Sequence, residues 1–271
     1  MLDIQYKSNE EIELIRESSL LVSETLTTVA KHIKPGVTTQ YLDSLAEEFI
    51  HSKNAIPGFK GYGGFPSSLC ISINEEVVHG IPGKREVKDG DLVSIDCGVL
   101  INQYYGDSAF TFAVGEISPE LQKLMRVTKE CLNFAIDNAK VGKRLGDISH
   151  AVQEHAEKNG FSVVRDLVGH GIGKSLHEKP EVPNFGKRGS GVQLKEGLVI
   201  AIEPMINLGR KQIKQLADGW TIRTADRKPS AHYEHTVAVR EDGGERMSTF
   251  ENIEKAVEEN ENLYKPTLVN G

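Results

Sequence analysis

The 271-residue sequence has few cysteines and aromatic residues, no long hydrophobic run and no excess of basic residues. Its three cysteines, Cys70, Cys97 and Cys131, are too few and too scattered for a disulfide framework or a Cys-x-x-Cys zinc site, so we expect a protein of the reducing cytoplasm. The longest apolar runs, such as 198–202, are far too short to cross a membrane, and the first residues do not resemble a signal peptide. A formal net charge of -7 argues against a protein that wraps DNA.

What the sequence does contain is an order of elements that occurs twice. In the first part, apolar periodicity predicts two helices and alternation predicts three strands, at 8–33, 39–53, 69–73, 92–99 and 107–114. In the second part, the same signals predict two helices and three strands again, at 120–139, 147–159, 163–168, 198–206 and 232–239. Helices followed by strands, twice over, predict an α+β fold with pseudo-two-fold symmetry.

The repeat is also visible in the letters. The segment VKDGDLVSID, which ends at Asp96, aligns without a gap on LKEGLVIAIE, which ends at Glu203. Because no linker separates the halves, at about 8–114 and 118–240, we expect one catalytic domain over 1–250. The acidic tail over 251–271 is expected to form a short solvated helix or to be disordered.

Four carboxylates occupy unusual strand positions. Alternation places Asp96 on a strand face with small and polar residues, and a turn at 101–102 would set it directly opposite Asp107. Like charges at that ~5 Å spacing are destabilising unless a cation lies between them. Glu203 and Glu234 hold strand positions in the second half, so the repeat predicts that all four acids meet. A single acid of this kind is more simply solvated or paired with Lys or Arg, but four at corresponding positions favour a metal site.

His170 adds a nitrogen ligand to these oxygens. It lies between two glycines, in Gly169-His170-Gly171, directly after an apolar segment. Alone, such a histidine is more typical of a turn or a core. Together with four carboxylates it forms a ligand set that suits two divalent ions of the Mn, Fe or Co type, with zinc and magnesium left open.

These five residues, in this order on a duplicated chain, resemble the pita-bread metallopeptidases. More narrowly, five segments are similar to those of the type I methionine aminopeptidases in their short bacterial form: 61–82, 169–173, 201–205, 218–221 and 233–236. The similarity covers about 4–250. It implies a pita-bread fold, in which the pseudo-two-fold halves surround a curved antiparallel sheet, and a monomeric protein.

The resemblance assigns a role to each ligand. It implies two divalent ions, of Co, Mn, Fe or Zn, that Asp107 and Glu234 bridge. Asp96 would complete the shell of one ion, and His170 and Glu203 that of the other. A water activated by the two ions would be the nucleophile, with Glu203 as the candidate base that helps deliver it.

Six further residues match positions that contact substrate in this family. His177 resembles the residue that bonds the scissile amide and its tetrahedral intermediate, and His79 the one near the main chain and the leaving amine. Either histidine could otherwise be an ordinary core or surface residue. The resemblance implies a soft apolar pocket for a methionine side chain, formed by Tyr62, Phe65, Cys70 and Trp220.

The implied reaction is removal of the initiator methionine from nascent chains whose second residue is small. One alternative is an Xaa-Pro aminopeptidase or prolidase, which uses the same five ligands; another is a non-catalytic pita-bread binding protein.

The segment 210–228 carries six basic residues against two acidic ones, which on charge alone indicates a solvated hairpin. Since the family acts on nascent chains, this basic loop is also a candidate for contact with ribosomal RNA.

Overall fold

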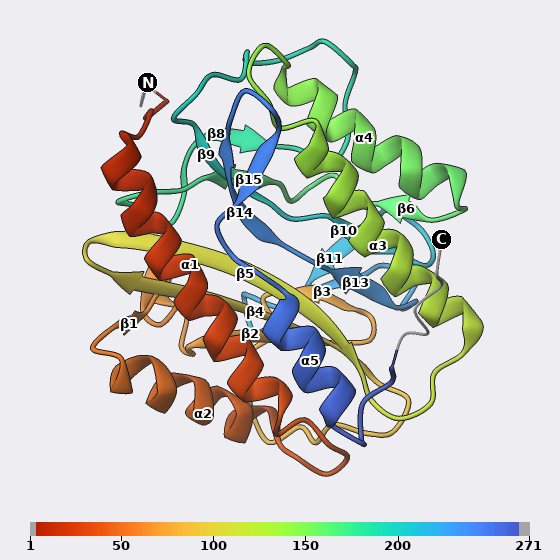
Figure 1. Cartoon of the computed structure of the whole chain (residues 1–271). Coiled ribbons are helices and arrows are strands. Elements are labelled where there is room, and N and C mark those ends of the chain that lie inside the picture. The colour runs from red at the N-terminus through yellow and green to blue at the C-terminus, as the bar shows by residue number, and fades with distance from the viewer. Residues whose placement is uncertain (1–3, 266–271) are drawn as a thin grey trace.

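The computed structural model describes residues 4–265 (Figure 1). The described residues form a single 3-10 turn, η1 (Tyr62–Gly64), and five α-helices: α1 (Asn9–Ala30), α2 (Thr39–Ser52), α3 (Pro119–Asp137), α4 (Leu145–Lys158) and α5 (Glu251–Glu259). No helix among them is long and apolar enough to cross a membrane.

Strands make up the layer that these helices cover. The long ones form a hairpin of β4 (Leu92–Ile101) and β5 (Tyr104–Ala113). The others are short: β1 (Ile56–Pro57), β2 (Leu69–Ile73), β3 (Glu76–Val78), β6 (Ser162–Val163), β7 (Gly169–Gly171), β8 (Glu178–Val182), β9 (Val199–Ile202), β10 (Met205–Asn207), β11 (Ile213–Gln215), β12 (Ile222–Thr224), β13 (Ser230–His232), β14 (His235–Val239) and β15 (Gly244–Arg246).

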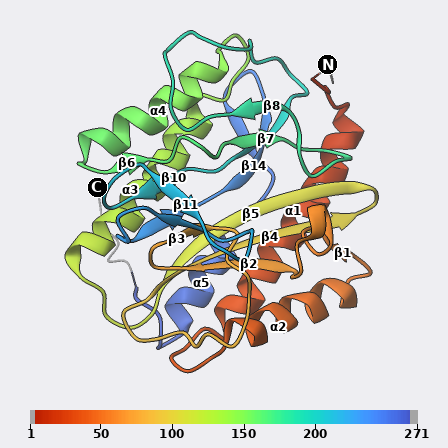
Figure 2. The same cartoon turned by 180° about the vertical axis from the view of Figure 1, so that it is seen from behind.

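The strands pair antiparallel, in two larger and two smaller sheets. One sheet has the order β1-β4-β2 with β5 paired to β4, and another has the order β15-β14-β9-β7-β8. The helices α1, α3 and α5 lie on one side of the strands, in front of them in Figure 1 and behind them in Figure 2. Apolar side chains between the helices and the strands form one large buried cluster. This cluster holds the long hairpin of β4 and β5 against the helices.

The helices begin where local signals predict. The Glu11 N–H donates to Ser8 Oγ at 3.3 Å and the Ser8 N–H donates to Glu11 Oε2 at 3.0 Å, which completes the capping box of α1. Ser118 caps α3, with Pro119 as its first residue. The four helices predicted upstream of residue 160 are therefore confirmed.

The register of the long hairpin differs from the expected one. Asn102 and Gln103, both in the left-handed region with φ of 51° and 68°, form the turn, so that Asp96 pairs with Ala109 and Gly98 with Asp107. The prediction that Asp96 directly faces Asp107 is wrong by two residues, because a two-residue hairpin turn needs two positions of positive φ. A shift by two residues preserves the strand face, so both carboxylates still project from the same side.

The strands predicted at 198–206 and 232–239 are each divided in two. The first stops at Glu203-Pro204, where proline supplies no N–H to a ladder, and the second stops at Tyr233-Glu234. At each break the chain passes from one sheet to another: β9 pairs with β14, whereas β10 pairs with β13. The strand predicted at 163–168 is likewise wrong and shrinks to Ser162–Val163.

The duplication is visible in the backbone. Gly36 and Gly142 occupy matching positions, each with a φ of 85°, and their N–H groups donate to Val87 O and Leu194 O. Gly90 and Gly197 match in the same way, with φ of 86° and 84°. The expected pseudo-two-fold α+β architecture is confirmed by these matching turns.

The tail after residue 250 is part of the fold as far as it is described. Helix α5 buries Ile253, Ala256 and Val257 against the rest of the molecule. The expectation of a short helix is therefore correct, whereas the expectation that it is solvated is wrong for this buried face. The Asn260 amide donates to Ala30 O and to the carbonyl of residue 33, each at 2.9 Å. Residues 266–271 lie outside the described part of the chain.

Candidate metal centre

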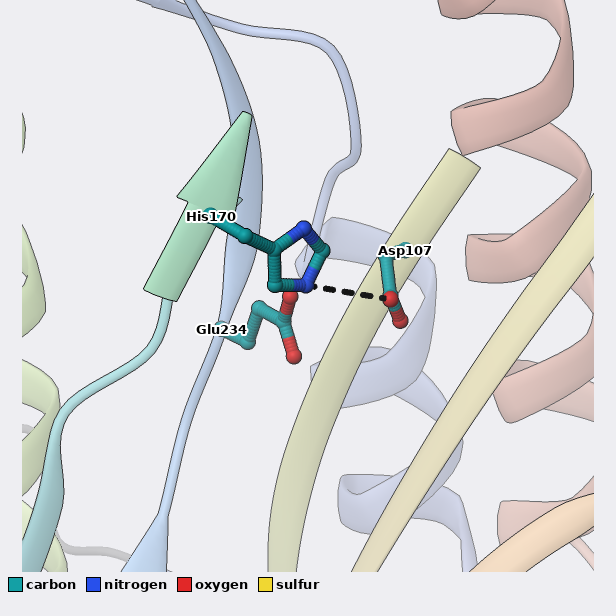
Figure 3. A group of neighbouring side chains, drawn as sticks. All are labelled: Asp107, His170 and Glu234. Carbon is teal, nitrogen blue, oxygen red and sulfur yellow. Dashed lines mark ion pairs between the residues drawn. The ribbon is translucent and has the colours of Figure 1, made fainter. Parts of the chain in front are cut away.

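The five predicted ligands converge from five separate strands or strand ends. Asp96 projects from β4, Asp107 from β5 and His170 from β7, while Glu203 follows β9 and Glu234 precedes β14. Figure 3 shows three of them, Asp107, His170 and Glu234, pointing toward a common point. One ligand atom from each of these three buried residues lies within 4.8 Å of those of the others.

His170 is oriented as a metal ligand would be. Its Nδ1–H donates to the carbonyl of Gly171 at 3.0 Å, so the lone pair lies on Nε2. Nε2 is 3.9 Å from Asp107 Oδ2 and 3.7 Å from Glu203 Oε1. Burial lowers the pKa of His170 to about 3, which keeps the imidazole neutral and able to bind a cation.

The four carboxylates are buried close together, so a nearby cation is needed if they are to be ionised. Burial raises the pKa of Asp96 to about 7. Burial, followed by the negative charge of neighbouring carboxylates, raises the pKa of Asp107, Glu203 and Glu234 well above the ordinary range. Three buried carboxylate oxygens have no hydrogen-bond partner among the described residues: Asp96 Oδ1, Asp107 Oδ1 and Glu234 Oε1. Unpaired oxygens beside a neutral imidazole fit divalent cations.

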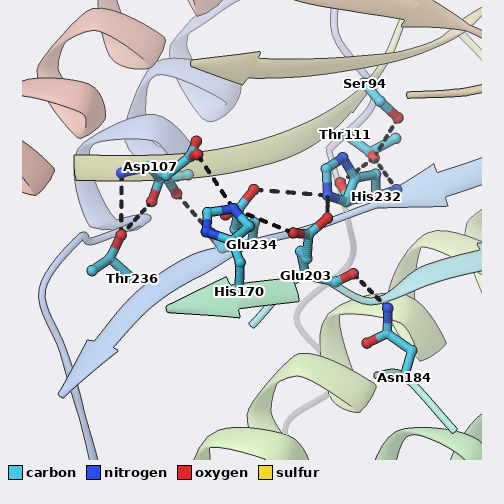
Figure 4. Close-up of polar contacts among 10 residues, drawn as sticks. Ser94, Asp107, Thr111, His170, Asn184, Glu203, His232, Glu234 and Thr236 are labelled. Carbon is cyan, nitrogen blue, oxygen red and sulfur yellow. Dashed lines mark hydrogen bonds and ion pairs between the residues drawn. The ribbon is translucent and has the colours of Figure 1, made fainter. Parts of the chain in front are cut away.

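Hydrogen bonds across the seam between β5 and β14 fix the backbone of these ligands (Figure 4). Asp107 N–H donates to Thr236 Oγ1 at 3.1 Å, and that hydroxyl donates to Asp107 O at 2.8 Å. Glu234 N–H donates to Ala109 O at 2.9 Å, and Ser108 Oγ donates to Glu234 O at 2.6 Å. The two halves of the molecule are therefore joined at the ligands themselves.

The repeat does not place all four acids at corresponding positions, as we expected. Asp96 and Glu203 do correspond. In the hairpins that follow, Leu92 pairs with Ala113 and Val199 with Ala238, so Asp107 corresponds to His232 and Glu234 to Ala109. The four acids meet in space because the halves face each other, and not because each half supplies the same two positions.

Both candidate catalytic histidines border the ligands. The His177 ring lies edge-on to the His170 ring, 4.2 Å between centroids, and its Nδ1 is 2.8 Å from Tyr62 Oη. His79 follows β3 in the left-handed region, with a φ of 58°. Burial, and secondarily the charge of His177, lower the pKa of His79 to about 4. His177 therefore lies between His170 and Tyr62.

The four predicted pocket residues lie close to this group. Phe65 and Trp220 meet edge to face at 5.1 Å between centroids, and Cys70 pairs with Asp96 across β2 and β4. The backbone N–H of Trp220 donates to Asp218 Oδ1 at 2.9 Å, which fixes the main chain at this residue. Tyr62, 40% exposed, lies at the outer edge beside His177.

Sequence reasoning missed one residue of the cluster, His232. It is buried, and its Nε2 lies 3.9 Å from Glu203 Oε2 and 3.8 Å from Glu234 Oε2. The signal was present, because alternation puts residues two apart on the same strand face and His232 stands two positions before Glu234.

Comparisons with known proteins agree on one family. The family model for metallopeptidase family M24 matches residues 13–241. The methionine aminopeptidase of Clostridium perfringens is 54% identical over 89% of this chain and 97% of its own length, and methionine aminopeptidase 1 of Bacillus subtilis is 52% identical over 88% and 96%. A crystal structure of methionine aminopeptidase from Rickettsia prowazekii matches with a TM-score of 0.90 and 42% identity, over 91% of this chain and 100% of that one. A prolidase from Pyrococcus horikoshii shares the fold, with a TM-score of 0.72, at 20% identity and over 63% of its length.

Proposed function

Because this chain belongs to metallopeptidase family M24 and, within it, to the methionine aminopeptidases, we propose that it removes the initiator methionine from new proteins whose second residue is small. The observation that carries this proposal is identity to methionine aminopeptidases over nearly their whole length. Prolidases resemble the chain in fold alone and are much longer. The complete ligand set argues against a non-catalytic relative.

The proposed cofactor is a pair of divalent ions, whose identity among Co, Mn, Fe and Zn stays open. Asp107 and Glu234 would bridge them, Asp96 would complete one shell, and His170 and Glu203 the other. When bound, the ions supply positive charge that acidifies water and polarises the amide oxygen. The buried unpaired oxygens and the neutral imidazole of His170 support this assignment.

The side chains around the ligands have separate tasks in the proposed reaction. Glu203 accepts a proton from the attacking water. Tyr62 Oη lies 2.8 Å from His177 Nδ1. In the proposed reaction Nδ1 accepts the tyrosine hydroxyl, and the proton of His177 is on Nε2, where it can stabilise negative charge on the amide oxygen. His79 faces the leaving amine. The proposed methionine pocket uses Phe65, Cys70 and Trp220, because a thioether packs well against aromatic edges.

We also propose that the basic loop over 210–228 contacts ribosomal RNA. This segment contains β11 and β12, which form a hairpin. Its two acids accept hydrogen bonds from the hairpin backbone. The backbone N–H of Arg210 donates to Asp226 at 2.7 Å, and that of Trp220 donates to Asp218. The basic groups are thereby left for phosphates. Reversal of Arg210, Lys211 and Lys214 to Glu should weaken ribosome binding and leave peptide hydrolysis unchanged; unaltered ribosome affinity would overturn this proposal.

We further propose that the protein is a monomer of the reducing cytoplasm. The free, buried state of Cys70, Cys97 and Cys131 supports such a compartment. Gel filtration with light scattering tests the oligomeric state.

A metal-exchange assay tests the main proposal. The protein is stripped with a chelator, reloaded with Mn, Co, Fe or Zn, and assayed with Met-Ala-Ser and with an Xaa-Pro peptide. We expect metal-dependent release of methionine from Met-Ala-Ser. Cleavage of the Xaa-Pro peptide alone would assign the chain to the prolidase activity instead.

A further inference from the structure

His232 carries a buried nitrogen that the proposed reaction does not use. The residue is 1% exposed, and its Nε2 has no hydrogen-bond partner among the described residues. A buried polar atom without a partner is destabilising by about 1–3 kcal/mol, so such an atom needs a physical explanation.

The surroundings of this nitrogen match those of His170. His170 Nε2 spans two carboxylates, at 3.9 Å from Asp107 Oδ2 and 3.7 Å from Glu203 Oε1. His232 Nε2 also spans two, at 3.9 Å from Glu203 Oε2 and 3.8 Å from Glu234 Oε2. The two imidazoles therefore approach different oxygens of Glu203, and Figure 4 shows them on either side of that carboxylate.

These spacings are those of ligands that share an ion. Hydrogen bonds between nitrogen and oxygen are about 2.7–3.2 Å long, so none of the four contacts is one. Ligand atoms at about 2.1 Å from one ion lie roughly 3.0 Å apart at a right angle and at most about 4.2 Å apart when opposite. All four nitrogen–oxygen distances fall inside that interval.

The internal repeat gives an independent argument. His232 is the counterpart of Asp107, and the two residues are held in the same way. Thr236 Oγ1 accepts from the N–H of Asp107 and donates to its carbonyl. Thr111 Oγ1 does the same for His232, at 2.9 Å and 2.7 Å. Each half therefore presents one side chain to the centre from an identical backbone clamp, an acid in the first half and an imidazole in the second.

We propose that His232 is a sixth protein ligand of the metal centre, whose Nε2 binds a divalent ion together with Glu203 and Glu234. The proposal rests on the metal centre of the proposed function. Two imidazoles in place of one favour borderline ions such as Co, Fe and Zn over Mn or Mg, because nitrogen ligands suit the former.

Proton NMR of the Co(II)-loaded protein counts the ligating histidines directly. Each imidazole bound to Co(II) has one remaining ring N–H, which appears as a strongly shifted resonance that vanishes in D2O. We expect two such resonances in the unaltered protein, and one each in His232→Gln and in His170→Ala. The double variant is expected to show none.

His235→Gln is the matched control. His235 is also buried in the same segment, but its Nδ1 lies 2.6 Å from Ser248 Oγ, away from the proposed ligands. It should keep both resonances. Calorimetric titration of metal-free protein with Co(II) is expected to show affinity weakened by about tenfold or more in His232→Gln.

One shifted resonance in the unaltered protein, kept in His232→Gln with Co(II) affinity unchanged, would overturn the proposal. Circular dichroism on each variant shows whether a lost resonance reflects unfolding, and His170→Ala then reports on His232 without altering it. A protein with two resonances that leaves Met-Ala-Ser intact would refute the proposed function and not the sixth ligand.

Discussion

The two halves of the molecule supply the proposed ligands in different ways. In the first half, Asp96 and Asp107 project from the interior of two uninterrupted ten-residue strands. In the second half, Glu203 and Glu234 occupy the points where the corresponding strands are broken. Their backbones are held by groups outside their own hairpin: Asn184 Nδ2 donates to Glu203 O at 2.9 Å, and β5 binds the backbone of Glu234.

This difference shows how one fold repeated twice builds one asymmetric site. The continuous hairpin places its carboxylates by regular ladder geometry, and Thr236 of the second half adds bonds to the backbone of Asp107 alone. The broken half places its ligands against the continuous one, so its geometry depends on the first half being formed. We therefore expect the first half to act as a template and the second half to complete the centre.

The largest expected effect comes from neutralising a proposed bridging carboxylate, one from each half, in two separate variants. Asp107→Asn and Glu234→Gln should each lower kcat/KM for Met-Ala-Ser by roughly 10³-fold or more, which corresponds to about 4 kcal/mol. Both should also lose the rise in Tm that added metal gives, because binding to the folded state alone stabilises it. Peptide hydrolysis and thermal melts with and without Mn measure these effects. Full activity in Glu234→Gln would show that the broken half contributes no ligand there.

A second test compares the half-buried acids at the corresponding positions, Asp96 and Glu203, in metal-free protein. The folded-state pKa of Asp96 is about 7, above that of the unfolded chain, so the stability present at low pH is lost as pH rises toward 7. Asp96→Asn should escape this loss, and its stability advantage over the unaltered protein should grow by roughly 2–3 kcal/mol between pH 5 and pH 8.

Thermal melts in a chelator across that range measure this advantage. Glu203→Gln should behave in the same direction, since burial also raises the pKa of Glu203. With saturating metal the sign should reverse, because the ion then stabilises the charged carboxylate. An advantage that is constant with pH would contradict a raised pKa of Asp96.

A third test compares the two threonine clamps at the seam. Thr236→Val and Thr111→Val each leave one N–H and one C=O unpaired, at Asp107 and His232 respectively. Thr111→Val also removes the 2.9 Å hydrogen bond to Ser94 Oγ. We expect losses of about 1–2 kcal/mol in the free energy of unfolding, the larger one in Thr111→Val, measured in urea on metal-free protein. A loss confined to one variant would show that the seam is symmetric in geometry but not in energy.

The smallest expected effect comes from replacing two glycines at matching turns of the two halves. Gly36 and Gly142 have the same positive φ, and a methyl group added at either would meet no atom within 4 Å. Alanine should therefore cost only the backbone strain, about 1 kcal/mol in each half. Urea denaturation of Gly36→Ala and Gly142→Ala checks this, with Gly83→Ala, which has open space and no positive φ, as control. Unequal costs would mean that the matching turns are not equivalent in stability.

The sequence predicted best what local chemistry decides. Capping by Ser8 and by Ser118 with Pro119 marks helix starts, and the structure follows both. The sequence also predicted the hairpin at 92–114, but not its register. The register depends on which two residues adopt positive φ in the turn, and these are Asn102 and Gln103, one residue later than we expected.

The parts that failed depend on how the sheets meet. Strand-like residues stand on both sides of Glu203-Pro204 and of Tyr233-Glu234, so the sequence pattern does not reveal that the chain changes sheets there. We predicted from the repeat that the four acids meet, and they do. The reason differs, because Asp107 and Glu234 are not counterparts in the two halves. His232 was missed because its role depends on what the opposite half presents, and no local pattern records that.

The seam between β5 and β14 also sets the moment at which this protein can begin to work. The proposed ligands are spread from Asp96 to Glu234, and β14, the strand after the last of them, ends at Val239. During synthesis the first hairpin is complete long before the second exists, and domains fold as units. A growing copy therefore lacks part of the proposed ligand set until Glu234 has been made and has joined β5, and it cannot act on other new chains before that point.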